Sequence, residues 1–381
     1  MIEKYSPQRG APRGVPAAAG PLADLARAAG LELQAVVAAG PLPAEIGKRL
    51  DAWLDAGRAG EMGYLARGRP HLTDLRRWKP WGRSLALFSL SYARASGGFK
   101  GGGKVARYAL GRDYHHLLGR RLEKLGRRLR KEGLVRRFRA VTDAAPLLER
   151  EWALRGGLGF RGKNTLLLHR IHGPWVLLGE LLVEAEWPPW VPPAPQPSCG
   201  SCTRCLEACP TGAFPRPYEI DSRRCISYLT IEKRGPIPRA LRPLLGEWVF
   251  GCDVCLEVCP FGSSQSDQGE LWGTLPALEQ LTLEDLLGLS RPAFERAFRG
   301  SPLRRPGWAG LLRNACVVLG NLGRGAAALE KALGHEEPLV RGHAAWALGI
   351  LGERTPLETA RAGEEADSVR EEIEAALAAC T

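Results

Sequence analysis

The sequence predicts a multidomain α+β protein with three different kinds of structured region. Helix-like and strand-like segments alternate over the first half of the chain, which indicates a mixed α/β domain. Eight cysteines gather between residues 198 and 262, and a helical motif recurs at a spacing of 29 residues near the C-terminus. At 381 residues, the chain is long enough for two or three domains.

The predicted mixed α/β domain covers residues 21–186. Apolar residues recur at helical spacing in 22–30, 43–57 and 113–133. Buried or alternating apolar runs predict strands at 84–92, 135–141, 164–169 and 175–184. Residues 1–20 are rich in Pro, Gly and Ala, and we expect a flexible tail there. The Pro-rich stretch 187–197 is expected to be an inter-domain linker.

The C-terminal part predicts α-helical repeats. NACVVLGNLG (314–323) aligns with HAAWALGILG (343–352), and VRGHAAWAL (340–348) aligns with VREEIEAAL (369–377). A short helical period that occurs three times is typical of HEAT-like repeats, because stacked repeats bury a core that single units cannot. Two ordinary helical hairpins are the alternative. The expected boundaries are 198–264 for the cysteine-rich domain, 265–306 for a helical connector and 307–381 for the repeats.

Charge and hydropathy limit the classes of protein that the chain can belong to. The formal net charge is +12, which favours a polyanionic partner. The longest apolar stretch, 175–183, is interrupted by Glu180 and is too short to span a membrane. The N-terminus lacks the apolar core of a secretory signal, so we expect a cytoplasmic protein with no membrane partner. Cysteines that cluster in a reducing compartment indicate metal binding rather than disulfides.

The cysteine spacing predicts a ferredoxin-like domain with two [4Fe–4S] clusters. The first run is C-x2-C-x2-C-x3-C-P, and the second is C-x2-C-x3-C-P with its first cysteine displaced upstream. In bacterial ferredoxins the last cysteine of each run binds the other cluster. This rule assigns cluster one to Cys199, Cys202, Cys205 and Cys259. It assigns cluster two to Cys209, Cys225, Cys252 and Cys255. Two zinc sites are the alternative, although zinc usually takes closed sets of four ligands.

Several long motifs resemble those of epoxyqueuosine reductases, in order, over about residues 22–352. They are KVARYALGRDYHHLLGRRL (104–122), TDAAPLLERE (142–151), GLGFRGKNTLLL (157–168), CGSCTRCLEACPTGA (199–213), RCISYLT (224–230) and GCDVCLEVCPFG (251–262). The resemblance implies an oxidoreductase that reduces epoxyqueuosine to queuosine at the wobble position of tRNAs with a GUN anticodon. It also implies a base-off cobalamin, held by the α/β domain and supplied with electrons by the clusters from an external electron donor.

The resemblance implies that Asp143, in T-D-A-A-P, donates a proton to the epoxide oxygen. Ala144 stands where the family commonly has Ser or Thr, so a hydrogen bond to the acid is missing. The alternative is that Asp143 caps the helix that follows Pro146. A proton donor must be protonated, so we expect burial beside the corrin to raise the pKa of Asp143.

The resemblance places further residues around the substrate and the cofactor. The substrate pocket would contain Tyr114, His115 and Arg150. Cobalamin would contact Arg69, Ala106, Asp143, Leu167, Leu178, Ser227, Cys252 and Asp253. Ordinary packing is the alternative role for Tyr114 and His115, and solvation is the alternative for Arg150.

A strongly basic segment predicts contact with an RNA backbone. Residues 100–139 hold fourteen Lys and Arg against three acidic residues, whereas a solvated helix face usually mixes the signs. Phosphate contacts would make binding sensitive to salt. A generally Arg-rich surface is the alternative. The predicted tRNA-binding residues are Arg120, Arg121, Lys124, Arg127, Arg128, Arg130, Lys131, Lys233 and Arg234, and Arg304, Arg305 and Arg313 could extend this surface.

Other functions remain possible for a chain with this pattern. A reductive dehalogenase uses a corrin and two clusters on small halogenated molecules. A ferredoxin-type electron carrier has no substrate of its own, and an iron–sulfur protein could bind RNA without catalysis.

Overall fold

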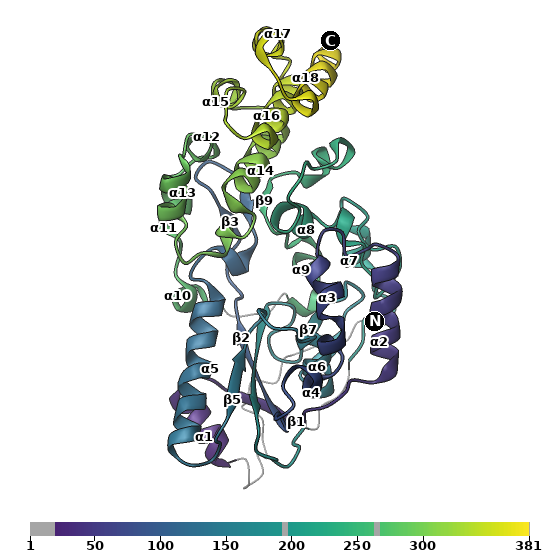
Figure 1. Ribbon diagram of the computed structural model, residues 1–381, viewed down its shortest axis with the longest axis vertical. Helices are drawn as coiled ribbons and strands as arrows, with labels where there is room; N and C mark the ends of the chain where they lie inside the picture. The colour runs from purple at the N-terminus through teal and green to yellow at the C-terminus, as the bar shows by residue number, and fades with distance from the viewer. Residues whose placement is uncertain (1–19, 193–196, 263–266, 381) are drawn as a thin grey trace.

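The computed structural model describes residues 20–192, 197–262 and 267–380. The α/β region, the cysteine-rich region and the helical tail follow one another along an elongated molecule (Figure 1). The expected tail, 1–20, lies outside the described residues except for Gly20. Residues 193–196 of the expected linker and the expected boundary at 264–265 also lie outside them. Each helix of the described part is too short or too polar to cross a bilayer.

The α/β region is built on a four-stranded antiparallel sheet with the order β1-β2-β8-β5. These strands are Leu33–Ala38, Ser84–Ser91, Val176–Val183 and Phe138–Val141, respectively. The strands β2, β5 and β8 lie within stretches that the sequence predicts as strands. Strand β1 was not predicted, although five of its six residues are buried.

Side chains alternate between the two faces of this sheet, as the pleat requires. On one face, Val36 and Phe88 pack against the helices α1 (Gly20–Ala28) and α5 (Tyr114–Lys131). On the other face, Val37 and Leu87 pack with α6 (Glu149–Arg155). Helix α5 lies so close to the sheet that a Cβ at Gly179 would be 2.9 Å from Leu122. The sheet is therefore covered on both sides and is fully part of the core.

Smaller elements complete this region. They are α2 (Ala44–Asp55), α3 (Gly63–Leu72), α4 (Leu75–Trp78), β6 (Gly159–Arg161) and β7 (Leu167–His169).

The expected linker, 187–197, is not free along its whole length. Trp190 is buried, and it exchanges two backbone hydrogen bonds of 2.8 Å with Val36 on the edge strand β1.

The cysteine-rich region contains short elements joined by tight turns. Its helices are α7 (Arg204–Glu207), α8 (Ile226–Ile231) and α9 (Val254–Glu257), with 3-10 turns at Ser222–Arg224, Arg239–Leu241, Pro243–Leu245 and Pro260–Gly262. Its strand β9 (Trp248–Phe250) pairs in parallel with β4 (Lys104–Val105), which pairs with β3 (Gly97–Gly98). The α/β region and the cysteine-rich region therefore share a small sheet.

The rest of the chain is helical. The connector contains α10 (Gly269–Trp272), α11 (Pro276–Gln280), α12 (Leu283–Leu287), α13 (Arg291–Ala297) and a 3-10 turn at Pro302–Arg304. The repeats contain α14 (Gly307–Leu322), α15 (Ala326–Ala332), α16 (Pro338–Leu351), α17 (Arg354–Gly363) and α18 (Asp367–Ala379). Helix α16 packs between α14 and α18. The three aligned sequence motifs fall on these three helices.

A buried polar network joins the helical tail to the cysteine-rich region. The Arg313 guanidinium is fully buried and donates to the carbonyls of Leu229, Lys233 and Gly235 at 2.7–2.9 Å. The Asn314 amide donates to the carbonyls of Thr230 and Val249. Arg313 therefore holds two regions together and is not available to bind RNA, contrary to its suggested place in the tRNA-binding surface.

We expect Arg313→Met to weaken this junction by about 3 kcal/mol or more, because three buried carbonyls lose their donor. Anaerobic urea unfolding of the cluster-loaded protein measures the loss. Arg361→Met, at an exposed position on α17, is the control and should change stability by less than about 0.5 kcal/mol. Equal effects of the two substitutions would contradict a structural role for Arg313.

Candidate active site

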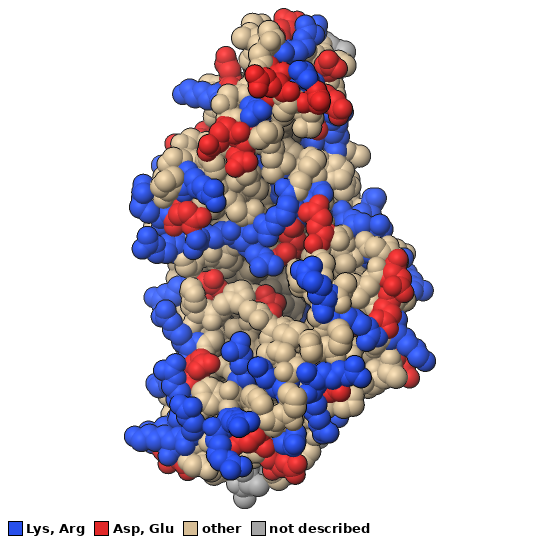
Figure 2. Space-filling view, viewed as in Figure 1, with Lys and Arg blue, Asp and Glu red and all other residues tan. Residues whose placement is uncertain are grey.

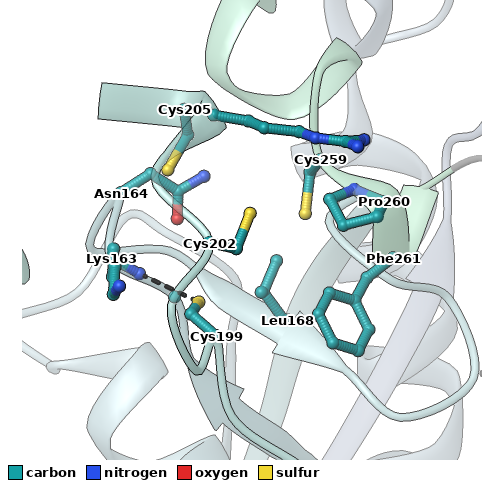
Figure 3. A pocket seen from close by; sticks show the side chains of 11 residues that line it. Lys163, Asn164, Leu168, Cys199, Cys202, Cys205, Cys259, Pro260 and Phe261 are labelled. Atoms are coloured by element: carbon teal, nitrogen blue, oxygen red, sulfur yellow. Dashed lines mark hydrogen bonds between the residues drawn. The ribbon is translucent and has the colours of Figure 1, made fainter. Parts of the chain in front are cut away.

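Four cysteines face a common space beside the hairpin of β6 and β7. The sulfurs of Cys199, Cys202, Cys205 and Cys259 line a partly open space of about 320 Å3, with Leu168 and Phe261 at its side (Figure 3). The Lys163 N–H donates to the Cys199 sulfur at 3.4 Å. The structure thus brings together the four residues that the sequence assigns to cluster one.

The other four cysteines form a second group, and protein closely surrounds the thiols of Cys225, Cys252 and Cys255. Burial raises the pKa of the Cys252 thiol, and the neighbouring thiols of Cys225 and Cys209 raise it further. Burial also raises the pKa of Cys255, together with the charges of Cys225, Cys252 and, from the other group, Cys205. Thiols affect one another's pKa in this way only when they are close, so the second group lies together and next to the first. Thiols with raised pKa values are deprotonated only when iron compensates their charge.

The arrangement of the thiols suits cubanes better than zinc ions. Within the described part of the chain, no three His, Cys, Asp or Glu side chains converge closely enough to hold one metal ion. In a cubane each thiolate binds a different iron atom, so the sulfurs lie farther apart than around a single zinc. Cys316 is fully buried in the repeats and belongs to neither group.

Asp143 follows β5 directly and lies in a tight turn before α6. The Thr142 hydroxyl donates to the Leu178 carbonyl at 3.0 Å and ties the turn to β8. Asp143 itself has a φ of 57°, a left-handed conformation that is uncommon outside glycine. The N-cap of α6 is Leu148, and it makes no side-chain capping bond. The alternative role of Asp143 as a helix cap is therefore wrong.

The Asp143 carboxylate bonds to the first turn of α5. Its Oδ2 accepts a hydrogen bond from the Tyr114 hydroxyl at 2.7 Å and lies 3.4 Å from His115 Nε2. The Asp143 side chain is 63% exposed, although protein surrounds it on several sides, as expected on the wall of a hollow. The Tyr114 hydroxyl supplies the kind of hydrogen bond that Ala144 cannot.

The expected rise in the pKa of Asp143 is wrong. Hydrogen bonding to His115 lowers the pKa of this carboxyl; burial raises it, but less strongly, and the Tyr114 hydrogen bond adds to the lowering. Burial lowers the pKa of His115, but hydrogen bonds to the Asp113 and Asp143 carboxylates outweigh it and raise the value to about 9. Asp143 is therefore ionised and His115 is cationic at neutral pH.

Two carboxyls lie behind the Asp143 turn, those of the buried Glu180 and the half-buried Glu149. Glu149 Oε1 accepts the Asp143 backbone N–H, and its side chain hydrogen bonds to Glu180 on β8. Burial, followed by the charge of Asp143, raises the pKa of Glu149 to about 7. Burial also raises the pKa of Glu180. The pair thus holds the strained backbone of Asp143 from the side of the sheet.

Side chains from the other regions come within range of the Asp143 charge. Figure 2 shows a hollow near the middle of the molecule with Lys and Arg along its rim. The charge of Arg305, just before the repeats, lowers the pKa of Asp143. Arg305 forms an ion pair with Glu232, and burial followed by the charge of Glu232 raises the pKa of Tyr64. Three regions of the chain therefore contribute to one site.

The structure groups most of the residues assigned to cobalamin. Ala106 donates its N–H to the Phe250 carbonyl, and the Arg107 N–H donates to the buried Asp253 carboxylate at 2.7 Å. Cys252 lies between these contacts, and Ser227 is half-buried on α8 of the same region. Leu167 and Leu178 pack in the core beside the Asp143 turn. Arg69, in contrast, forms an ion pair with Asp51 on α2.

The other predicted residues lie at or near the surface. Arg150 donates to the Thr165 carbonyl at 3.1 Å, next to the Asp143 turn. On α5, most of the predicted basic residues are exposed, while Arg121 is half-buried and donates to the Gly30 carbonyl. Lys233 forms an ion pair with Glu61, and the Arg234 guanidinium donates to the Arg305 carbonyl.

Several residues of this site were not predicted from the sequence. Asp113, Glu149 and Glu180 were not identified as functional, nor was Tyr108, whose ring packs on Tyr114 with 5.9 Å between centroids. Glu180 did carry a signal, because a charged residue interrupts an apolar strand there. The other three have no pattern of their own in the sequence.

Comparisons with known protein families agree with the three regions. A family described as 4Fe-4S double cluster binding domain matches residues 198–262. A family described as Epoxyqueuosine reductase QueG, DUF1730 matches 73–144, and HEAT repeats match 309–378. The chain is 40% identical over 321 residues to the epoxyqueuosine reductase of Escherichia coli K12, covering 80% of this chain and 83% of that protein. It is 43% identical over 324 residues to that of Pseudomonas aeruginosa, covering 80% and 87%.

Solved structures show the same architecture. A crystal structure of an epoxyqueuosine reductase with a tRNA-Tyr epoxyqueuosine-modified stem loop has a TM-score of 0.84 at 27% identity, covering 94% of this chain and 98% of that one. The structure of the Bacillus subtilis enzyme has a TM-score of 0.80 at 27% identity, covering 95% and 98%. In that structure the catalytic loop, which carries an aspartate, is swung out of the active site.

Single cysteine substitutions should remove one cluster at a time. We expect Cys202→Ala to lose about four of the eight irons and Cys225→Ala to lose the other four, because each cubane needs all its thiolates. Iron and sulfide analysis after anaerobic reconstitution measures this. Cys316→Ala should keep all the iron, and retention of full iron by either ligand variant would contradict the assignment.

The bond between Glu149 and the Asp143 backbone should matter for turnover. Glu149→Ala removes the acceptor of the Asp143 N–H, and we expect kcat to fall by about tenfold or more as the turn loosens. Glu149→Gln keeps a carbonyl oxygen at this place and should retain most of the activity. A pair of variants with equal kcat would argue against this anchor.

Proposed function

Because the chain belongs to the epoxyqueuosine reductase family, we propose that it reduces epoxyqueuosine to queuosine in tRNA, with Asp143 as the group that protonates the epoxide oxygen. The chain carries two [4Fe–4S] clusters, in keeping with its double-cluster domain. The observation that carries the proposal is the partly exposed Asp143 carboxylate, which bonds to Tyr114 and His115 of α5 and lies within range of the Arg305 charge.

The residues near Asp143 fit a flat macrocycle such as the corrin ring of cobalamin. Beside Asp143 lies a packed aromatic group, formed by Tyr92, Tyr108, Tyr114 and Trp175. Next to it, a Cβ at Gly251 would lie 2.5 Å from the Ala106 Cβ, so the loop that begins at Gly251 is packed closely against the α/β region. When bound there, base-off cobalamin would supply a redox-active cobalt centre within reach of electrons from the clusters. Ala106, Leu178, Ser227, Cys252 and Asp253 would hold it, partly through their backbone groups.

The two clusters differ in their position, which suggests a direction of electron flow. Cluster one faces a partly open space, and an external electron donor could reach it there. Asp253, next to the cluster-two ligand Cys252, interacts with Tyr108 beside Asp143. Electrons would thus enter at cluster one and leave from cluster two toward the hollow.

The substrate pocket would be formed by Tyr114, His115 and Arg150. Tyr114 and His115 fix the direction of the Asp143 carboxylate. Arg150 lies on α6 next to the Asp143 turn and presents a cation to it. Breaking the C–O bonds develops negative charge on the epoxide oxygen, and a proton held at Asp143 would neutralise that charge.

The basic surface of α5 would bind the phosphates of the tRNA. The helix begins at the hollow with Tyr114 and extends away from it for about 27 Å. Its outer face presents Arg127, Arg130 and Lys131 to solvent. Glu123 lies 3.7 Å from Arg127 and Glu132 lies 2.7 Å from Arg128, so part of this charge is paired. A tRNA with a GUN anticodon would place its modified wobble base in the hollow.

We expect Asp143→Asn to keep both clusters and tRNA affinity but to lose at least about 100-fold in kcat, because an amide cannot supply the proton. The assay measures queuosine formed on an epoxyqueuosine-modified stem loop with cobalamin and a low-potential reductant. Asp55→Asn, at an exposed position at the end of α2, serves as the control. Wild-type turnover by Asp143→Asn would remove Asp143 from the mechanism.

Reversing Arg127, Arg128 and Arg130 together to Glu should weaken tRNA binding and make it less sensitive to salt. Each lost phosphate contact reduces the slope of log K against log salt by roughly 0.7–0.9. Fluorescence anisotropy over a salt series measures both quantities. The same three positions changed to Gln should give an intermediate effect, and unchanged affinity of the Glu variant at low salt would exclude this surface.

A further inference from the structure

The His115 ring lies between two carboxylates. Its Nδ1 is 2.7 Å from Asp113 Oδ1, and its Nε2 is 3.4 Å from Asp143 Oδ2. An ionised carboxylate only accepts hydrogen bonds, so each ring nitrogen must carry a proton to satisfy its neighbour. Only the imidazolium has protons on both nitrogens. The geometry alone therefore favours a cationic His115.

The local fold keeps His115 in this position. Asp113 is the N-cap of α5, and the same Oδ1 that faces the ring also accepts the His115 backbone N–H at 2.9 Å. The rings of His115 and Tyr114 lie with centroids 4.0 Å apart. The His115 side chain is 34% exposed, so solvent can return a proton to it after a proton has been lost.

The other charged and titratable groups nearby do not change this balance. Asp143 is faced by Tyr114 and His115 of α5, by Glu149 of α6 and by Arg305 from the connector to the repeats. Tyr108 and Tyr64 also lie within range of its charge. His116 acts on Asp113. The two carboxylates beside the ring raise the pKa of His115 to about 9 against the effect of burial.

We infer that His115 stores the proton that Asp143 delivers to the epoxide oxygen, so that the acid of this reaction is the His115–Asp143 pair. This inference rests on the proposed function. It explains how an ionised Asp143 can act as a proton donor at neutral pH. His115 acts through Asp143 and so is a positioning residue rather than a group that touches the substrate.

The chemistry balances with two electrons and two protons. The proton on His115 Nε2 moves to the Asp143 carboxylate, which passes it to the epoxide oxygen as the first C–O bond breaks. Two electrons come from a low-potential one-electron donor through the clusters. The second C–O bond then breaks, the C=C bond forms, and the oxygen leaves as water after it takes a second proton. The pair supplies that proton as well, once solvent has recharged His115.

A titration that does not depend on turnover tests where the proton resides. The cluster-loaded protein is labelled with 13C-histidine and followed by NMR between pH 5 and pH 10, with His115→Gln used to assign the signal. We expect His115 to titrate near pH 9 in the wild type. In Asp143→Asn its pKa should fall by at least about one unit, because one carboxylate partner is lost. A His115 that titrates near 6.5 in the wild type would overturn the inference.

The pH dependence of kcat separates proton storage from a merely structural role. The kcat of the wild type should not change between about pH 6 and pH 8.5. In His115→Gln, Asp143 must be protonated directly, so kcat should fall about tenfold per pH unit across the same range. His116→Gln, at the exposed neighbouring position, should keep the wild-type profile. A lower but equally flat profile in His115→Gln would overturn the inference.

A second variant carries the test if His115→Gln does not fold. Asp113→Asn keeps a good helix cap but removes one charge beside the ring. The pH above which its kcat begins to fall should be lower than in the wild type by at least about one unit. If that pH does not change, the inference is overturned. If the wild type does not reduce the epoxide at any pH, the proposed function fails. If it does so with normal rates and His115→Gln shares its profile, only the inference fails.

Discussion

Iron–thiolate bonding is the constraint on which the rest of this structure depends. With the ligands assigned from the sequence, each cubane would take cysteines from both runs, so the 199–209 segment and the 252–259 segment must lie together before either site is complete. The thiols repel one another when they are ionised without iron. Metal loading therefore adds to the stability that this region gains from its own core around Ile226, Leu229 and Trp248.

The cysteine-rich region in turn positions the α/β region and the helical tail. The small sheet of β3, β4 and β9 fastens it to the α/β region, and the buried Arg313 network fastens it to the helical tail. These two junctions fix the positions of the regions relative to one another. Asp143 belongs to the α/β region and Arg305 to the connector before the repeats, so the approach of these two charges depends on both junctions.

Electrostatics within the site follow from local pairing more than from burial. Burial by itself would raise the pKa of the Asp143 carboxyl. The hydrogen bond with His115 outweighs burial and lowers this pKa instead. Glu149 and Glu180, which share the buried side of the same turn without a cation between them, follow burial instead. Hydrogen-bond partners thus favour the ionised form of Asp143, whereas burial shifts Glu149 and Glu180 toward the protonated form.

The sequence by itself determined the regions whose signals are local. Thiol spacing defined the two-cluster domain, the 29-residue period defined the helical repeats, and charge bias marked α5, because each pattern is complete within a short stretch. The strand β1 and the partners of Asp143 were decided only by the tertiary structure. Tyr114 and Asp143 are 29 positions apart, Arg305 lies in another region, and the pKa of a carboxyl depends on which of these side chains folding brings within a few ångströms.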